Sequence, residues 1–175
     1  MSDRWKPHVT VAALVARPRP GRPVDDPATA FLLVEEDTLE GPRLNNPAGH
    51  LELGESPLEA VVREALEETA CVFSPECLVG VYMSRHLRPR QQLDITYLRL
   101  AFGGTVSEPD PRLRLDTGIR RTLWMTLDEL RACRPQHRSA LVLRSLEDMV
   151  AGQRLPLSAV SIDRSLYEPE IKGPP

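Results

Sequence analysis

Residues 49–71 read GHLELGESPLEAVVREALEETAC, a glycine-containing loop followed by a helix rich in glutamate. Ser56 precedes Pro57, and Glu59 lies three positions after Ser56, which matches a capping box with proline at the first helical position. The pattern therefore predicts a helix that starts at Pro57. In the loop before it, Gly49 and Gly54 permit backbone conformations that other residues resist.

The predicted helix has an apolar side and an acidic side. At about 100° per residue, one side collects Leu58, Val61, Val62, Ala65, Leu66 and Thr69, a normal core-facing stripe. The opposite side collects Glu64, Glu67 and Glu68, which repel one another, and Arg63 is the only cation on the helix. A hard divalent cation would relieve this repulsion, since it prefers oxygen ligands. Taken alone, the three glutamates fit a solvated acidic face better than a metal site.

The complete segment resembles the Nudix box, whose pattern is G-x5-E-x7-R-E-U-x-E-E-x-G-U with U aliphatic. The matching residues, in identity and spacing, are Gly49, Glu55, Arg63, Glu64, Glu67 and Glu68. Ala70 replaces the last glycine, and Cys71 stands where an aliphatic residue is usual. Because alanine resists positive φ, Ala70 conflicts with a left-handed exit from the helix.

Stretches outside the box are similar to a branch of small Nudix hydrolases. They read KPHVTVAALV, FLLVEE, NNPAGHLE, a late LW followed by TLDEL, and GQRLPL at 152–157. The similarity covers most of the chain, apart from a proline-rich loop and the final twenty or so residues. It implies one Nudix domain over residues 1–175, an α/β fold in which a mixed sheet is sandwiched between helices and carries a loop–helix–loop motif.

The resemblance also implies a reaction, hydrolysis of a pyrophosphate bond with Mg²⁺, for which Mn²⁺ is a possible substitute. The implied substrates are nucleoside di- or triphosphates, or a related organic pyrophosphate such as thiamine-pyrimidine pyrophosphate. Glu67 and Glu68 are then metal ligands, Glu64 is a ligand and candidate base, and the Gly49 carbonyl is a further ligand. Arg63 is expected to pair with Glu55 and hold the loop against the helix.

Candidate residues outside these positions are weaker. The family often uses a further carboxylate from a later loop, for which Asp116, eight residues before Trp124, is the first candidate and Asp94 the second. His50, Arg85 and His86 are candidates for substrate binding, with packed or solvated surface positions as the alternative for each.

The remaining chain predicts strands and helices in a mixed order. Apolar runs at 8–16, 30–36, 76–84, 93–102 and 120–125 predict strands, of which the first two pair as a hairpin. Residues 17–29 carry four prolines and three arginines, which predicts a solvated loop, with a phosphate-binding patch as the less favoured interpretation. Irregular backbone is predicted at 44–53, where Asn45, Asn46, Pro47 and Gly49 occur. Irregular connections are also expected at 86–92 and 103–116.

Two helices are expected in the C-terminal part of the chain. Thr126 is expected to cap a short helix ending near Pro135, and a second helix is expected at 139–151. The tail at 158–175 is expected to be flexible.

Composition excludes several classes of function. The net charge of −3 gives no electrostatic footprint for nucleic acid, so an RNA-end hydrolase is not favoured. Three cysteines without CxxC spacing are expected to be reduced, apolar groups. No signal peptide or membrane span is evident, so a cytoplasmic location and a small-molecule partner are expected. The remaining alternative is a catalytically silent Nudix-like module that senses a nucleotide, although such modules usually lack box glutamates.

Overall fold

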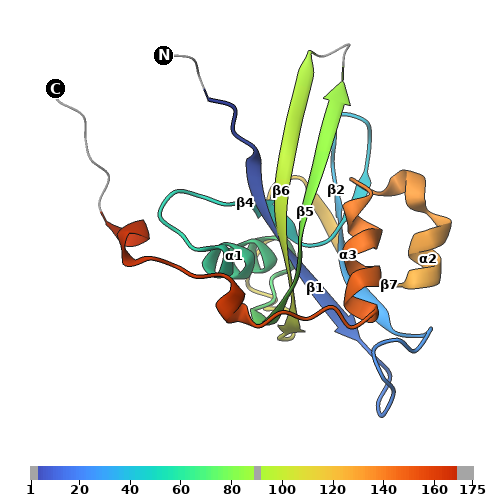
Figure 1. Ribbon diagram of the computed structural model, residues 1–175. Coiled ribbons are helices and arrows are strands. Elements are labelled where there is room, and N and C mark those ends of the chain that lie inside the picture. The colour runs from blue at the N-terminus through green and yellow to red at the C-terminus, as the bar shows by residue number, and fades with distance from the viewer. Residues whose placement is uncertain (1–3, 89–91, 169–175) are drawn as a thin grey trace.

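The computed structural model describes residues 4–88 and 92–168, and in this part of the chain helices cover both faces of a mixed sheet of seven strands (Figure 1). The strands are β1 (His8–Arg17), β2 (Ala30–Glu36), β3 (Arg43–Asn45), β4 (Ala48–His50), β5 (Phe73–Arg88), β6 (Leu93–Val106) and β7 (Ile119–Thr126). The α-helices are α1 (Pro57–Thr69), α2 (Leu127–Ala132) and α3 (Leu141–Val150). The main strand order is β3-β2-β1-β6-β5, with β4 paired to β1 and β7 paired to β2.

Strand β1 is central because it pairs with three other strands. It runs parallel to β6 from His8 opposite Tyr97 to Val15 opposite Gly104, and antiparallel to β4. Its last two residues pair with the start of β2, so the predicted hairpin around residues 17–29 is confirmed, but only at its base. A strand that is buried on both faces needs a continuous apolar run, which explains the sequence HVTVAALVA.

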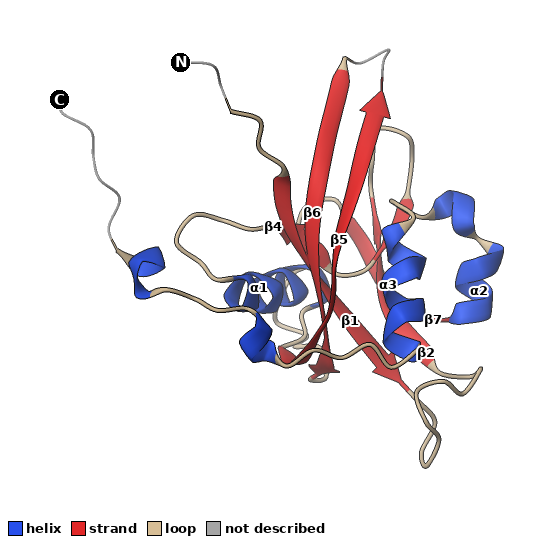
Figure 2. Cartoon of the chain, in the orientation of Figure 1, coloured by secondary structure: helices blue, strands red, loops and turns tan. Residues whose placement is uncertain are grey.

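The two faces of the sheet carry separate hydrophobic cores. Val11, Ala13 and Val15 of β1 pack with α1 on one face. The alternate residues Ala12 and Leu14 pack with the apolar residues of α2 and α3 on the other face. This arrangement, visible with the helices in blue in Figure 2, confirms the predicted α/β sandwich with a mixed sheet.

The hairpin of β5 and β6 is longer than the sequence predicts. The irregular connection expected at 86–92 is wrong at its start, because β5 continues to Arg88, which pairs with Leu93. Residues 89–91, including Arg90, lie outside the described residues. The connection expected at 103–116 is also wrong at its start, because β6 runs through Gly103 and Gly104 to Val106. A side chain at Gly104 would overlap the carbonyl of Ser74, so the glycine permits close strand pairing.

Two short strands lie in the stretch expected to be irregular. Strand β3 pairs with β2, and β4 pairs with Thr10, Val11 and Ala12 of β1. Strands of three residues carry no detectable period, so sequence patterns do not reveal them. Their effect is to fix residues 43–50 against the sheet beside α1.

The C-terminal half follows the predicted capping signals. Thr126 and Glu129 form a capping box at the start of α2, which ends at Ala132, before a 3₁₀ turn at Arg134–Gln136. Gly152 has a φ of 84° just after α3. In the tail, 3₁₀ turns occupy Leu157–Ala159 and Arg164–Tyr167, and the Tyr167 hydroxyl donates to Glu59 at 2.9 Å. Within the described residues, every helix is too short or too polar to cross a bilayer.

Candidate active site

Helix α1 begins where its capping box requires. The Ser56 hydroxyl accepts from the Glu59 amide at 3.2 Å, and the Glu59 carboxylate accepts from the Ser56 amide at 2.8 Å. At the other end, Ala70 has a φ of 57°, so the left-handed exit is present although the residue is alanine. The site is therefore built on a helix whose two ends are both fixed.

Arg63 connects the loop to the helix. It donates to both oxygens of Glu55, at 2.7 and 3.0 Å, and to the His50 carbonyl at 3.0 Å. It also donates to Glu64 at 2.8 Å and to Glu67 at 3.0 Å. The pairing with Glu55 is the one that the sequence predicts. The Arg63 guanidinium lowers the pKa of Glu55 and holds three carboxylates around one cation.

Strand β4 packs directly over the glutamate face of α1. A side chain at Gly49 would overlap the Glu64 carboxylate, so only glycine allows this approach. The Ala48 amide donates to Glu68 at 2.8 Å. Glu68 is consequently 8% exposed, which contradicts the expectation that the glutamates face away from the core. Helical periodicity placed Glu68 opposite the apolar stripe, but the short strand that covers it was not predicted.

Burial and neighbouring carboxylates raise the pKa of Glu64 and of Glu68. Burial is the main cause that raises the pKa of Glu68 to about 8; the charges of Glu64, Glu36 and Asp116 contribute to this shift, and the hydrogen bond from the Ala48 amide opposes it. Burial also raises the pKa of Glu64, which Arg63 opposes and Glu67 and Asp116 reinforce. The site therefore concentrates negative charge that a cation would stabilise.

The later-loop carboxylate that lies beside α1 is Asp116. Its amide donates to the Glu67 carbonyl at 2.9 Å, and its charge acts on both Glu64 and Glu68. Asp94, the second candidate, is instead half-exposed and pairs with Arg85 at 2.7 Å. Of the two, Asp116 alone is near the glutamates.

The carboxylate oxygens of this site are ligands of the kind that a hard divalent cation prefers. Their side chains, however, are not arranged around one metal position. Within residues 4–88 and 92–168, no group of three or more His, Cys, Asp or Glu side chains surrounds a common point as a metal would require. The carboxylates of Glu64 and Glu67 instead accept hydrogen bonds from Arg63, and the Glu68 carboxylate accepts one from the Ala48 amide. A bound cation would have to take the place of Arg63 at Glu64 and Glu67.

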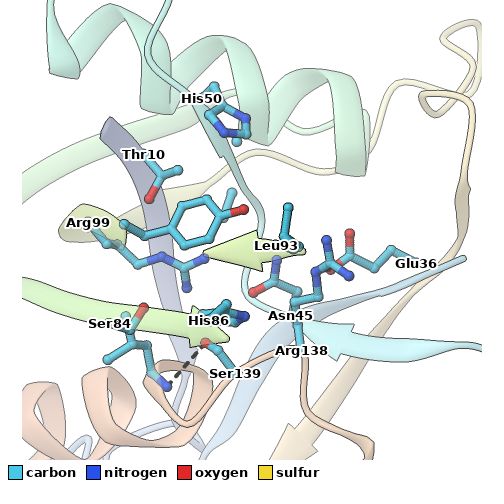
Figure 3. Close-up of a pocket in the computed structure, with 14 residues that line it drawn as sticks. Thr10, Glu36, Asn45, His50, Ser84, His86, Leu93, Arg99, Arg138 and Ser139 are labelled. Carbon is cyan, nitrogen blue, oxygen red and sulfur yellow. Dashed lines mark hydrogen bonds and ion pairs between the residues drawn. The ribbon is translucent and has the colours of Figure 1, made fainter. Parts of the chain in front are cut away.

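A cavity of about 330 Å³ opens beside these carboxylates (Figure 3). Ala48, Gly49 and His50 form the wall that the cavity shares with the glutamate cluster. His50 and His86, two of the predicted substrate-binding residues, line it. Burial lowers the pKa of His50, and the neighbouring His8 lowers it further.

Arg85, the third residue predicted to bind substrate, is not among the residues that line this cavity. Successive side chains of a strand point to opposite faces, so Ser84 and His86 face the cavity while Arg85 faces away. Arg85 is exposed and bound to Asp94 by two hydrogen bonds.

Sequence reasoning missed most of the polar residues of the cavity. They are Thr10, Glu36, Asn45, Ser84, Tyr97, Arg99, Arg138 and Ser139. A signal existed for Tyr97 and Arg99, since they alternate with Leu98 and Leu100 in a predicted strand and so had to share one face. The remaining residues come together only through the sheet order.

All three cysteines, each within the described residues, are free, and Cys71 and Cys77 are buried, as the sequence predicts.

Comparison with known proteins establishes the class. The NUDIX domain profile matches residues 6–144. The chain therefore belongs to the Nudix family and is a Nudix hydrolase, an enzyme class that acts on pyrophosphate bonds and generally uses a divalent metal ion.

Individual relatives agree with this assignment. Phosphatase NudJ of Escherichia coli (strain K12) is 32% identical over 157 residues, which cover 89% of this chain and 92% of the relative. A solved NUDIX hydrolase from Nitrosomonas europaea is 43% identical with a TM-score of 0.77, covering 90% of this chain and 98% of that one. The NUDIX domain of Shewanella oneidensis NrtR, solved with ADP ribose, shares the fold at 14% identity and a TM-score of 0.63, covering 85% and 90% of the two chains.

Proposed function

We propose that this enzyme hydrolyses a pyrophosphate bond of a nucleoside di- or triphosphate, or of a related small organic pyrophosphate, in a Mg²⁺-dependent reaction. The observation that carries the proposal is the set of mutually repelling carboxylates, Glu64, Glu67, Glu68 and Asp116, beside a cavity. Similarity to phosphatase NudJ favours a phosphate-releasing enzyme of this kind, and a thiamine-pyrimidine pyrophosphate is a further candidate substrate.

The residues have distinct roles in this proposal. Glu64, Glu67, Glu68 and the Gly49 carbonyl would hold Mg²⁺, with Asp116 as a further ligand and Mn²⁺ as a possible substitute. The bound ion would neutralise charge on the phosphate oxygens and lower the pKa of a coordinated water. Glu64, whose pKa burial raises, would accept a proton from the attacking water in this proposal.

Arg63 and Glu55 position these ligands. Because Arg63 donates to the His50 carbonyl and to Glu55, it keeps residues 49–55 against α1 whether or not its bonds to Glu64 and Glu67 are broken. Gly49, which lacks a side chain, allows the backbone at this position to lie close to the Glu64 carboxylate. His50 and His86, which line the cavity, would contact the substrate in this proposal.

Phosphate release from a panel of nucleoside di- and triphosphates and organic pyrophosphates tests the proposal. We expect release from some members with Mg²⁺ or Mn²⁺, and none with EDTA. Release that persists in EDTA would contradict the metal assignment. Binding without release across the panel would favour the sensor interpretation.

A further inference from the structure

A buried arginine, Arg99, extends its guanidinium into the cavity beside the carboxylates (Figure 3). Arg99 is 8% exposed, and in the part of the chain that the structure describes its Nη1 atom has no hydrogen-bond partner. Burial lowers the pKa of Arg99, so the surroundings disfavour its charge. Burying a cation with an unpaired donor is costly, and an anion that accepts a hydrogen bond from it offsets that cost. Arg99 therefore indicates an anionic ligand.

The charged groups of the cavity also favour an anion. Its lining contains two arginines, Arg99 and Arg138, and Glu36 is the one carboxylate among the described residues that line it. Glu36 lies 3.5 Å from Arg138, and its charge also acts on Arg99, so one carboxylate faces two arginines. Glu68 attracts Arg99 too, but it does not line the cavity, and its carboxylate accepts from the Ala48 amide. The lining consequently has a net positive charge.

Helix α3 begins at the same cavity. Ser139 and Leu141, at the N-terminus of the helix, are among the lining residues. The Leu141 amide already donates to the Ser139 hydroxyl at 3.2 Å, so the helix contributes the positive end of its dipole rather than this donor. Helix N-termini attract phosphate and other oxyanions. The helix and the buried arginine are independent features that point to the same kind of ligand.

The cavity also contains an acceptor without a partner. Among the described residues, Oδ1 of Asn45 accepts no hydrogen bond. In Figure 3, Asn45 and Arg99 enter the cavity from different sides. The four oxygens of a tetrahedral ion point in different directions, so one of them can accept from Arg99 while another, if it carries a proton, donates to Asn45. The two unpaired groups therefore favour a tetrahedral oxyanion that retains a hydroxyl.

We propose that this cavity binds a free orthophosphate ion, with Arg99 donating to the ion, Arg138 and the N-terminus of α3 adding positive charge, and Oδ1 of Asn45 accepting from its hydroxyl. Orthophosphate keeps a hydroxyl at neutral pH, whereas sulfate has none. A phosphate monoester, with a second pKa of about 6, has lost most of its own. Binding of the ion does not rest on the proposed function. Its consequence does, since phosphate released by the proposed reaction would inhibit the enzyme from this cavity.

Calorimetry on enzyme that has been freed of metal with EDTA and then dialysed tests the proposal. Without a metal ion the carboxylates of α1 repel anions, so binding reports on the cavity and is separate from hydrolysis. At about pH 7 we expect orthophosphate to bind with a Kd below about 1 mM. Sulfate and methyl phosphate should each bind at least about tenfold more weakly, because both leave Asn45 unpaired.

Three results of this titration would overturn the proposal. The first is the absence of orthophosphate binding at about 10 mM. The second is a Kd for sulfate within about threefold of that for orthophosphate, since the hydroxyl would then be irrelevant. The third is equal or tighter binding of methyl phosphate, since the site would then serve a phosphate ester and not the free ion.

Variants identify the residues responsible. Arg99→Met removes the buried charge but keeps an apolar side chain in its place, and it should abolish orthophosphate binding. Arg121→Met is the matched control, because Arg121 pairs with Glu35 outside the cavity. Orthophosphate should raise the melting temperature of the wild type and of the control, but not that of Arg99→Met. If Arg99→Met does not fold, Arg138→Gln should weaken binding at least about fivefold. Wild-type affinity in either folded cavity variant would contradict the proposal.

Discussion

The backbone of Gly49 lies so close to the Glu64 carboxylate that any side chain at position 49 would overlap it. One glycine thereby sets the distance between strand β4 and helix α1. Both elements that carry proposed metal ligands are held at this contact, so the close approach of their backbones is part of the site.

Gly49→Ala should therefore reduce activity more than stability. The added methyl group must displace the Glu64 side chain or separate β4 from α1, which disturbs ligand geometry. We expect kcat to fall by at least about tenfold, and the free energy of unfolding by about 1–3 kcal/mol. Phosphate release and urea denaturation measure the two effects, and wild-type kcat in this variant would contradict the contact.

Arg63→Ala should release the loop from α1. The change removes hydrogen bonds to Glu55, the His50 carbonyl, Glu64 and Glu67, so we expect a loss of about 1–3 kcal/mol together with most of the activity. Arg112→Ala is the control, since Arg112 pairs with Asp110 on the exposed surface and should change neither property. Equal effects of the two variants would argue against a special role for Arg63.

Ala70→Gly should stabilise the protein. Ala70 ends α1 with a φ of 57°, a conformation in which glycine is not strained. We expect the free energy of unfolding to rise by about 1 kcal/mol, the usual cost of the left-handed conformation for a residue with a Cβ. Urea denaturation measures it, and a destabilised variant would show that another contact of the Ala70 methyl group outweighs the strain.

Glu68→Gln should stabilise the metal-free enzyme in a pH-dependent manner. The folded-state pKa of Glu68, about 8, is above its unfolded value, so wild-type stability from this group is present at low pH and lost as pH rises toward 8. Glutamine cannot ionise. In EDTA, the advantage of the variant should therefore grow by on the order of 2 kcal/mol between about pH 6 and about pH 8.5. An advantage that shrinks with pH would contradict the raised pKa.

The sequence predicted the parts of the fold that depend on local signals. The caps at Ser56 and Thr126 and the apolar strands were predicted because capping boxes and hydrophobic runs act within a few residues. Strands β3 and β4 were missed because they contain three residues each and exist through pairing with distant strands. The end of β5 was underestimated because an exposed hairpin lacks the apolar pattern of a buried strand, and the end of β6 because Gly103 and Gly104 are typical of a turn.

In the candidate site, too, features set by neighbouring residues were predicted, and features set by distant strands were not. The Arg63–Glu55 pair followed from fixed spacing in one motif, and the structure contains it. The burial of Glu68 did not follow, since it depends on β4. Arg85 was expected in a connection, whereas β5 continues through it and turns its side chain away from the cavity. Arg99 and Glu36 come from strands far apart in sequence, and only the sheet order brings them to one cavity.

The central claim, that the α1 glutamates hold the catalytic metal, is tested most directly by the rate of phosphate release from Glu67→Gln. The substrate should be the panel compound that the wild type hydrolyses fastest with Mg²⁺, and Glu76→Gln, at an exposed position in β5, is the matched control. The account predicts at least about a hundredfold loss for Glu67→Gln with an unchanged melting temperature, and none for the control. A folded Glu67→Gln enzyme with a rate within about threefold of wild type would contradict it.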